Sequence, residues 1–169
     1  LYPSLLAPFT ALPHGIIVAK VTHWLIGAAA AVLTAGLAAT LFDRRVALLA
    51  GVGVALDPFL VFFSSLLLTE ARFLCAIVAL WGVLAASLRS DRIPLARWLL
   101  IGATGALCLY LRESSLGLLL VAAAFVISCR GFDARSVSGA IVAALCVVAS
   151  LVPWALRNRQ VTGEWRWLT

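Results

Sequence analysis

The sequence predicts an all-α fold, a polytopic transmembrane helical bundle of about six membrane helices, and three observations lead to it. Of the 169 residues, 64% are hydrophobic and 12% are charged, whereas ordinary soluble domains have about 45–50% apolar and about 25% charged residues. The mean hydropathy is +1.10. The charges also divide the chain into six apolar runs, most of them near the length of about 20 residues that crosses a bilayer. This composition argues against a soluble domain and against disorder.

The first two expected helices are bounded by charge. The first, 18–42, begins beside Lys20 and ends at Asp43, the first of three charged residues in a row. The second, 46–64, is apolar except at Asp57, which a proline follows. Proline removes a helix hydrogen bond and kinks the helix, so the carboxylate of Asp57 is expected either to bond a freed backbone group or to line a cavity.

The other four expected helices span 69–88, 95–111, 114–129 and 137–156. Thr69 and Glu70 open the first of them, and Arg112 with Glu113 separates the middle two. Several runs are shorter than 20 residues, so these helices either borrow flanking residues or lie in protein rather than lipid. We expect one transmembrane domain over 1–169, with 157–169 as a polar, non-cytoplasmic tail.

The arginines orient the bundle. Seven of them flank the first, third and fifth loops: Arg44, Arg45, Arg89, Arg92, Arg97, Arg130 and Arg135. Only Arg72 and Arg112 lie at the second and fourth loops. Because cytoplasmic loops carry the excess of basic residues, the odd loops are predicted to be cytoplasmic. Six crossings then put Glu70, Arg112 and Arg157 on one non-cytoplasmic face.

The composition also bears on the chain's origin and its chemistry. Methionine is absent, and the start at Leu1 has no signal-peptide pattern, so we expect an internal piece of a longer protein. One lysine against twelve arginines indicates a bacterial, GC-rich genome; a bacterial inner membrane is the expected location. The basic residues are scattered, which predicts no nucleic-acid partner.

The four cysteines are far apart and form no CxxC pair, so we expect buried thiols that act as small hydrophobic residues. No metalloprotease, nucleophile-elbow or phosphate-loop fingerprint is present. No ligand cluster suggests a metal site. The residues leave open whether a divalent cation is used, and they imply no other cofactor.

Glu70 and Arg112 are the main candidate site residues. Glu70 either stabilises a helix start, with Thr69 as the N-cap, or faces a cavity at headgroup level, where it could bind a sugar hydroxyl, a metal or a cation. Arg112 either pairs with Glu113 in an interfacial turn or grips a phosphate with its guanidinium. Nearby, Lys20 is expected to snorkel to the interface, and His23 is expected to have no ligand partner.

Three segments in order resemble the membrane half of GT-C glycosyltransferases. The segment Ala55–Glu70 is similar to that superfamily's apolar-Pro-aromatic-Ser…Thr-Glu stretch. The segment Gly102–Arg112 is similar to its glycine-rich helix ending in Leu-x-Arg, and Leu151–Asn158 to its Pro-Trp-x-x-Arg-Asn motif. The opening 1–8 resembles the segment after the first external loop. This group includes the protein O-mannosyltransferases of family 39 and the lipid A aminoarabinose transferase.

The resemblance implies an inverting transfer of a sugar from a polyprenyl-phosphate carrier to a lipid, glycan or protein acceptor outside the cytoplasm. By resemblance, Arg112 matches the basic position near the carrier phosphate, and Glu70 matches the acidic position in the catalytic cavity. Arg157 and Asp57 would lie at the face of the site. The family's catalytic aspartate would precede Leu1, so we expect this chain alone to be inactive.

Two residues differ from the family pattern, and three alternative functions remain open. Glu113 stands where proline or a small residue is common, and Asp57 where serine or asparagine is common. A transporter or flippase would also have a proline-kinked helix and buried charge, although the three predicted hairpins show no internal repeat. A structural membrane subunit, or a polymerase or ligase of surface polysaccharides, is the further alternative.

Overall fold

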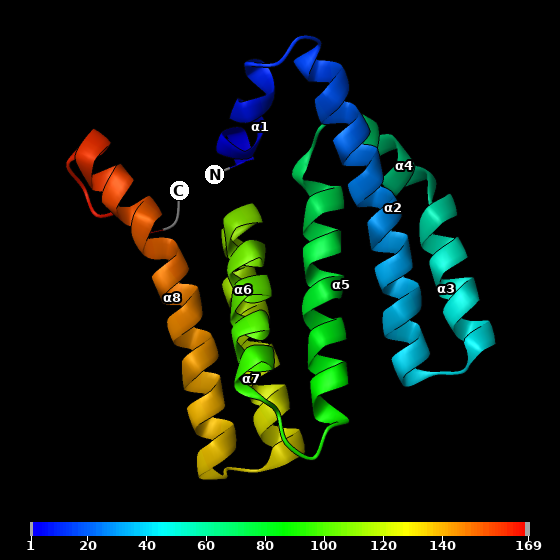
Figure 1. Cartoon of the computed structure of the whole chain (residues 1–169), viewed down its shortest axis with the longest axis vertical. Coiled ribbons are helices and arrows are strands. Elements are labelled where there is room, and N and C mark those ends of the chain that lie inside the picture. The colour runs from blue at the N-terminus through cyan, green and yellow to red at the C-terminus, as the bar shows by residue number, and fades with distance from the viewer. Residues whose placement is uncertain (1, 168–169) are drawn as a thin grey trace. The chain divides into compact units, whose positions relative to one another are not determined.

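The computed structural model describes residues 2–167, with side chains from residue 6 onward, and over this range it contains helices and no strand. Figure 1 shows their arrangement. In chain order they are α1 (Tyr2–Thr10), α2 (Gly15–Leu41), α3 (Arg44–Leu56), α4 (Pro58–Ser65), α5 (Thr69–Leu88), α6 (Leu95–Leu111), the 3-10 turn η1 (Glu113–Ser115), α7 (Leu116–Arg130) and α8 (Ala134–Thr162). The predicted all-α fold is confirmed.

Four stretches of this described part are long and apolar enough to cross a membrane: α2, α5, η1 with α7, and α8. The helices α3 and α4 pass the same test only as a pair, and they are bent by 47° at the break between them. The remaining apolar helix, α6, has 17 residues. The six predicted runs thus become four long helices, one broken pair and one short helix.

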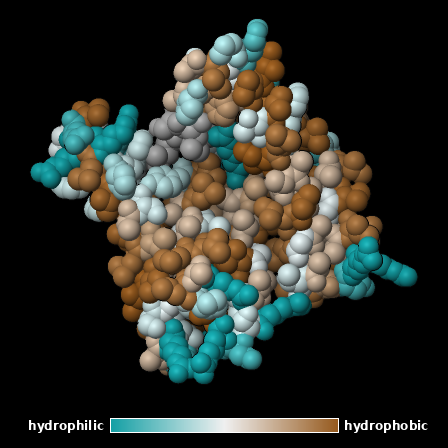
Figure 2. Space-filling model, in the orientation of Figure 1, coloured by the Kyte–Doolittle hydropathy of each residue, from teal (hydrophilic) through white to brown (hydrophobic). Residues whose placement is uncertain are grey.

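The outer surfaces of the helices are apolar. Large side chains such as Ile16, Val32, Leu49 and Phe59 each expose more than 70% of their area. Figure 2 shows brown, hydrophobic residues along the helix walls, with teal residues gathered where helices end. A surface of this kind suits hydrocarbon, because lipid tails and apolar side chains share the same polarity. The chain is therefore a helical membrane protein.

The chain divides into two compact units, and the first runs from Leu1 to Ala85. Within it α2 and α3 form an antiparallel hairpin (Figure 1). The Asp43 carboxylate caps α3 by accepting a hydrogen bond from Val46 N at 2.8 Å, and Ala31 and Gly51 are buried where the two helices meet. The helix α4, which follows α3, also packs against α2.

The break between α3 and α4 lies at Asp57. Its carboxylate accepts hydrogen bonds from Phe59 N at 2.8 Å and Leu60 N at 3.1 Å. Pro58 occupies the first turn of α4, where its missing N–H costs nothing. Of the two expected roles for Asp57, the structure therefore has the bond to freed backbone groups, and the predicted kink is a complete break in the helix.

The second unit runs from Ala86 to Thr169 and centres on the pair α6 and α8. These helices approach closely at Gly102, where an added Cβ would lie 2.6 Å from Cys146 Cβ and 2.7 Å from Ala143 O. Small residues allow such contact between membrane helices. Tyr110 OH donates a hydrogen bond to Ser150 O, which ties the end of α6 to α8.

The expected helices differ from the observed ones in three places. The helix α1 was not predicted at all. The helix expected at 18–42 begins at Gly15, with His14 in a left-handed conformation before it (φ 58°). The helix expected to stop at 156 continues to Thr162, because Arg157–Thr162 keep helical hydrogen bonds despite their polarity. The predicted tail 157–169 therefore begins inside α8, and its last two residues lie outside the described range.

Candidate functional site

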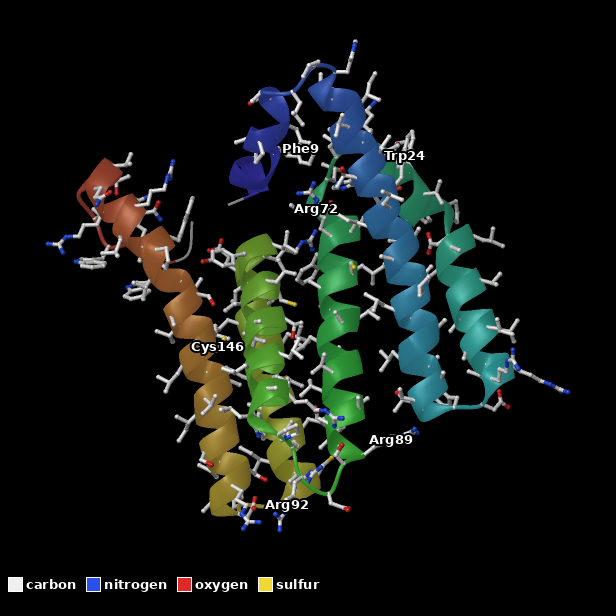
Figure 3. All side chains as sticks on the ribbon, in the orientation of Figure 1. Phe9, Trp24, Arg72, Arg89, Arg92 and Cys146 are labelled. Atoms are coloured by element: carbon white, nitrogen blue, oxygen red, sulfur yellow. The ribbon has the colours of Figure 1, made fainter. Side chains whose placement is uncertain are left out.

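A buried polar cluster joins α2 to the start of α5 in the first unit. We call it the α2–α5 cluster, and it consists of His23, the Leu68 carbonyl, Glu70 and Arg72. His23 is 0% exposed and Arg72 is 9% exposed. Arg72 Nε donates a hydrogen bond to His23 Nδ1 at 3.2 Å, and His23 Nε2 lies 2.6 Å from Leu68 O. Figure 3 labels Arg72 at the first turn of α5.

These two contacts determine the state of the histidine ring. A carbonyl oxygen only accepts hydrogen bonds, so the proton of the ring lies on Nε2. Nδ1 accepts from the guanidinium, so it carries no proton. His23 is thus a neutral Nε2–H tautomer that holds Arg72 in place from α2, the first helix of the hairpin.

The backbone before α5 brings these groups together. Leu67 has a left-handed conformation (φ 53°), and the turn it makes directs the Leu68 carbonyl toward His23. The helix α5 begins at Thr69 itself, so Glu70 lies in its first turn, as predicted. A carboxylate there is favoured by the positive end of the helix dipole.

Glu70 belongs to the cluster by its charge. Both Glu70 and Arg72 lie close enough to His23 to act on it electrostatically. The Glu70 side chain is half-buried, and its Oε2 atom is fully buried. An acid, a cation and a neutral imidazole therefore meet at one level of this unit, which is the level of the third turn of α2.

The sequence does not predict the hydrogen bonds of His23, and it predicts Arg72 only as a loop charge. Both omissions have the same cause, because 49 residues separate His23 from Arg72 and no periodic pattern links them. One signal was present: a lone histidine among apolar residues and a lone arginine beside Glu70 are both costly near hydrocarbon unless they meet.

Arg112 belongs to the second unit, where α6 ends. Its backbone is extended (φ −147°, ψ 119°), and its carbonyl accepts hydrogen bonds from Ser115 N and Ser115 Oγ. The side chains of Arg112 and Glu113 are exposed. The predicted turn between the two helices is thus present, and its position at a membrane interface stays a prediction. Glu70 and Arg112 lie in different units, and their shared cavity stays a prediction.

The other two candidates have structural partners. Asp57 caps α4, as described above. Arg157 is exposed on α8, and its guanidinium lies 5.1 Å from the centroid of the Trp154 ring. Asn158, in the same motif, is buried and donates from Nδ2 to Arg166 O at 3.0 Å. The last turns of α8 therefore fold back on the residues that follow.

An apolar cavity of about 760 Å³ lies in the first unit between α2, α3 and α4. Trp24 and Phe62 line it with Pro58, and Ser64 and Ser65 supply its polar atoms. It is of the size that holds a ligand, and it shares the helix α2 with the α2–α5 cluster.

The described residues contain no group of three or more His, Cys, Asp or Glu side chains placed to hold a metal ion. All four cysteines are free thiols; Cys108 is buried, whereas Cys129 is exposed, contrary to the prediction for it.

The chain matches no family model, no curated protein and no solved structure.

Proposed function

We propose that this chain is part of a membrane glycosyltransferase that takes a sugar from a polyprenyl-phosphate carrier on the non-cytoplasmic side of the membrane. The resemblance of three ordered segments to GT-C enzymes supports the proposal. The α2–α5 cluster supports it independently, since its acid and its cation are of the kinds that a sugar phosphate requires.

The burial of the α2–α5 cluster is the observation that carries the proposal. A charged residue at the centre of a bilayer costs at least about 2.5–3.5 kcal/mol, and an ionisable residue within a membrane segment is by default a hypothesis for a functional site. Here Arg72 is 9% exposed and rests on a histidine that is 0% exposed. Simple anchoring of a loop at the interface would not need a histidine to fix the guanidinium. A guanidinium held in one orientation is suited to phosphate oxygens.

The chemistry assigns roles by charge. The acceptor hydroxyl attacks the anomeric carbon, the bond from that carbon to the phosphate oxygen breaks, and the carrier phosphate leaves with the electron pair. A carboxylate base takes the hydroxyl proton; by resemblance this base lies on a segment before Leu1. A guanidinium would stabilise the leaving phosphate; the resemblance gives this role to Arg112, and Arg72 offers the same chemistry within the α2–α5 cluster. Glu70 would accept hydrogen bonds from sugar hydroxyls.

Binding of the carrier tests the proposal on this chain without requiring turnover. The full chain would be reconstituted in nanodiscs, and a mannosyl polyprenyl phosphate would be titrated against the uncharged polyprenol. We expect the phosphate-bearing lipid to bind and the alcohol not to bind. The variants Arg112→Gln and Glu70→Gln should each weaken binding by about tenfold or more, which is the effect of losing one charge-assisted hydrogen bond.

The matched control is Arg44→Gln, which removes one guanidinium from the first turn of α3. It should bind the carrier as the unmodified chain does. Equal affinity for the mannosyl polyprenyl phosphate and the polyprenol would contradict the proposal. Unchanged binding in both site variants would contradict it too. In the full-length enzyme, the same two variants should abolish sugar transfer while the protein is still expressed.

A transporter or flippase is the second candidate, and the broken pair α3–α4 favours it. Transporters place substrate at helices interrupted near mid-membrane, and this pair is bent by 47° at Asp57. In proteoliposomes a transporter would move a labelled polyprenyl-linked sugar between leaflets, and Asp57→Ala would slow that movement. Net transfer of the sugar to an acceptor, with no movement across the bilayer, would exclude this candidate.

A further inference from the structure

A second cavity, which is lined by charged residues, lies at the other end of α6, away from Arg112. It has a volume of about 540 Å³ and opens where α6 begins and where α7 passes to α8. Three arginines line it, namely Arg92, Arg130 and Arg135. Figure 3 labels Arg92 on the loop at this end. Neither the resemblance nor the proposed function uses this cavity.

One of the three arginines builds the wall of the cavity. Arg130 donates hydrogen bonds to the carbonyls of Ser87 at 2.9 Å, Leu88 at 3.3 Å and Asp91 at 3.0 Å, and also to the Ser90 carbonyl. It thereby closes the C-terminal end of α5, whose last carbonyls have no partner within the helix. Arg130 is a fixed positive charge in a half-buried position.

The two acidic residues that line the cavity are Asp91 and Asp133. The Asp133 carboxylate accepts a hydrogen bond from Ser136 N at 3.0 Å and so caps α8. Its negative charge is directed at the positive end of that helix. Asp91, Arg92 and Arg135 are exposed. The positive charge that is open to a ligand therefore comes mainly from Arg92 and Arg135, and the exposed Asp91 offsets part of it.

The floor of the cavity is a packed indole. Trp98 is 7% exposed, and its ring lies on α8 at Gly139, where an added Cβ would come within 2.0 Å of Trp98 Cε2. Ile93, Leu95 and Val142 complete the apolar part of the lining. Positive charge at the mouth and apolar surface below it match a molecule that is anionic at one end and apolar at the other.

We propose that this cavity binds the phosphate headgroup of an anionic phospholipid. The charge is complementary, and the cavity is at the ends of apolar helices, where headgroups lie. Basic pockets between membrane helices are known sites for such headgroups, and arginine binds phosphate in a bidentate geometry. The volume falls in the range of about 300–1,000 Å³ that holds small ligands.

Lipid-dependent thermal stability tests this proposal. The full chain in mixed micelles would be heated at increasing phosphatidylglycerol in phosphatidylcholine, with total lipid held constant. We expect the unfolding midpoint to rise and saturate, because a ligand that binds only the folded state stabilises it. The double variant Arg92→Gln/Arg135→Gln should raise the phosphatidylglycerol concentration at half-saturation by about tenfold or more. Both side chains are exposed, so the variant should still fold.

The control is the double variant Arg44→Gln/Arg45→Gln, which removes the same charge from the first turn of α3. It should respond to phosphatidylglycerol like the unmodified chain. The proposal is overturned if phosphatidylglycerol and phosphatidylcholine act alike, or if both double variants lose the response equally. An equal, saturable response to inorganic phosphate would assign the cavity to a soluble anion and would also contradict it.

Discussion

His23 has the most consequential environment of any single residue in the described part of the chain. Its ring is fully buried and bonded on both nitrogens, to Arg72 and to the Leu68 carbonyl. A neutral imidazole of this kind costs less to bury than a second charge. It still supplies the acceptor that Arg72 Nε needs, and the position of the guanidinium therefore depends on a residue of another helix.

Replacing His23 should destabilise the first unit. His23→Leu keeps the volume but removes the partners of Arg72 Nε and the Leu68 carbonyl, and leaving such buried groups unpaired costs about 1–3 kcal/mol. We expect a lower midpoint of thermal unfolding in detergent. His14→Asn is the control, because His14 is exposed and asparagine tolerates its left-handed conformation. Equal midpoints for the two variants would contradict the account.

Asp133 gives a pH-dependent contribution to stability. Hydrogen bonds from the Ser136 side chain and then from the Ser136 backbone lower the pKa of the Asp133 carboxyl. A pKa lower in the folded state means that the contribution is present above the unfolded value of about 3.9 and is lost as pH falls through the folded value.

The cap of α8 should therefore weaken in acid. Between pH 7 and about pH 2.5, thermal unfolding of the chain should shift downward more than that of Asp133→Asn, because asparagine caps a helix without titrating. Asp133→Ala should be less stable than both at neutral pH. Parallel shifts for the chain and Asp133→Asn would show that this carboxylate has no part in the pH dependence.

At the scale of elements, the contact between α6 and α8 depends on the absence of a side chain. Gly102 faces the Cys146 side chain and the Ala143 carbonyl so closely that a methyl group has no room. By contrast, a Cβ at Gly117 in α7 would meet nothing within 4 Å. The two glycines thus have opposite energetic roles in neighbouring helices.

This difference gives a paired prediction. Gly102→Ala should destabilise the second unit by about 1–3 kcal/mol, which is the usual effect of overpacking. Gly117→Ala should be neutral or stabilising by up to about 1 kcal/mol, because alanine favours helix. Thermal unfolding of both variants in one detergent measures the difference. A midpoint that falls no further for Gly102→Ala than for Gly117→Ala would contradict the close approach.

The sequence predicted elements better than contacts. Apolar runs between charges placed α5 and α6 at their observed bounds, 69–88 and 95–111. Runs of this kind could not show that α8 continues through Arg157–Thr162, because polarity marks where a membrane ends and not where a helix ends. Proline correctly marked the break at Asp57.

The site was predicted in part, and for a physical reason. The position of Glu70 in a first turn follows from local sequence, and so does the turn at Arg112. The pairing of His23 with Arg72 depends on how the chain between them folds back on α2. The packing of α2 against α3 and α4 determines this path. No local pattern contains that information.

At the scale of the whole molecule, the central claim is that Glu70 and Arg112 open onto the same side of the membrane. The claim requires that the chain cross the membrane through α5 and cross back through α6. The 17 residues of α6 span about 25 Å at 1.5 Å per residue, slightly less than a hydrocarbon core of about 30 Å. The claim therefore depends on this short helix.

Labelling of single cysteines from one side measures this directly. With the four native cysteines replaced by alanine, the variants Thr69→Cys, Ser90→Cys and Ser114→Cys would be exposed in oriented vesicles to a membrane-impermeant maleimide. The account predicts that positions 69 and 114 are labelled from the same side and position 90 from the opposite side. Labelling of positions 69 and 114 from opposite sides would separate Glu70 from Arg112 and contradict the proposed donor site.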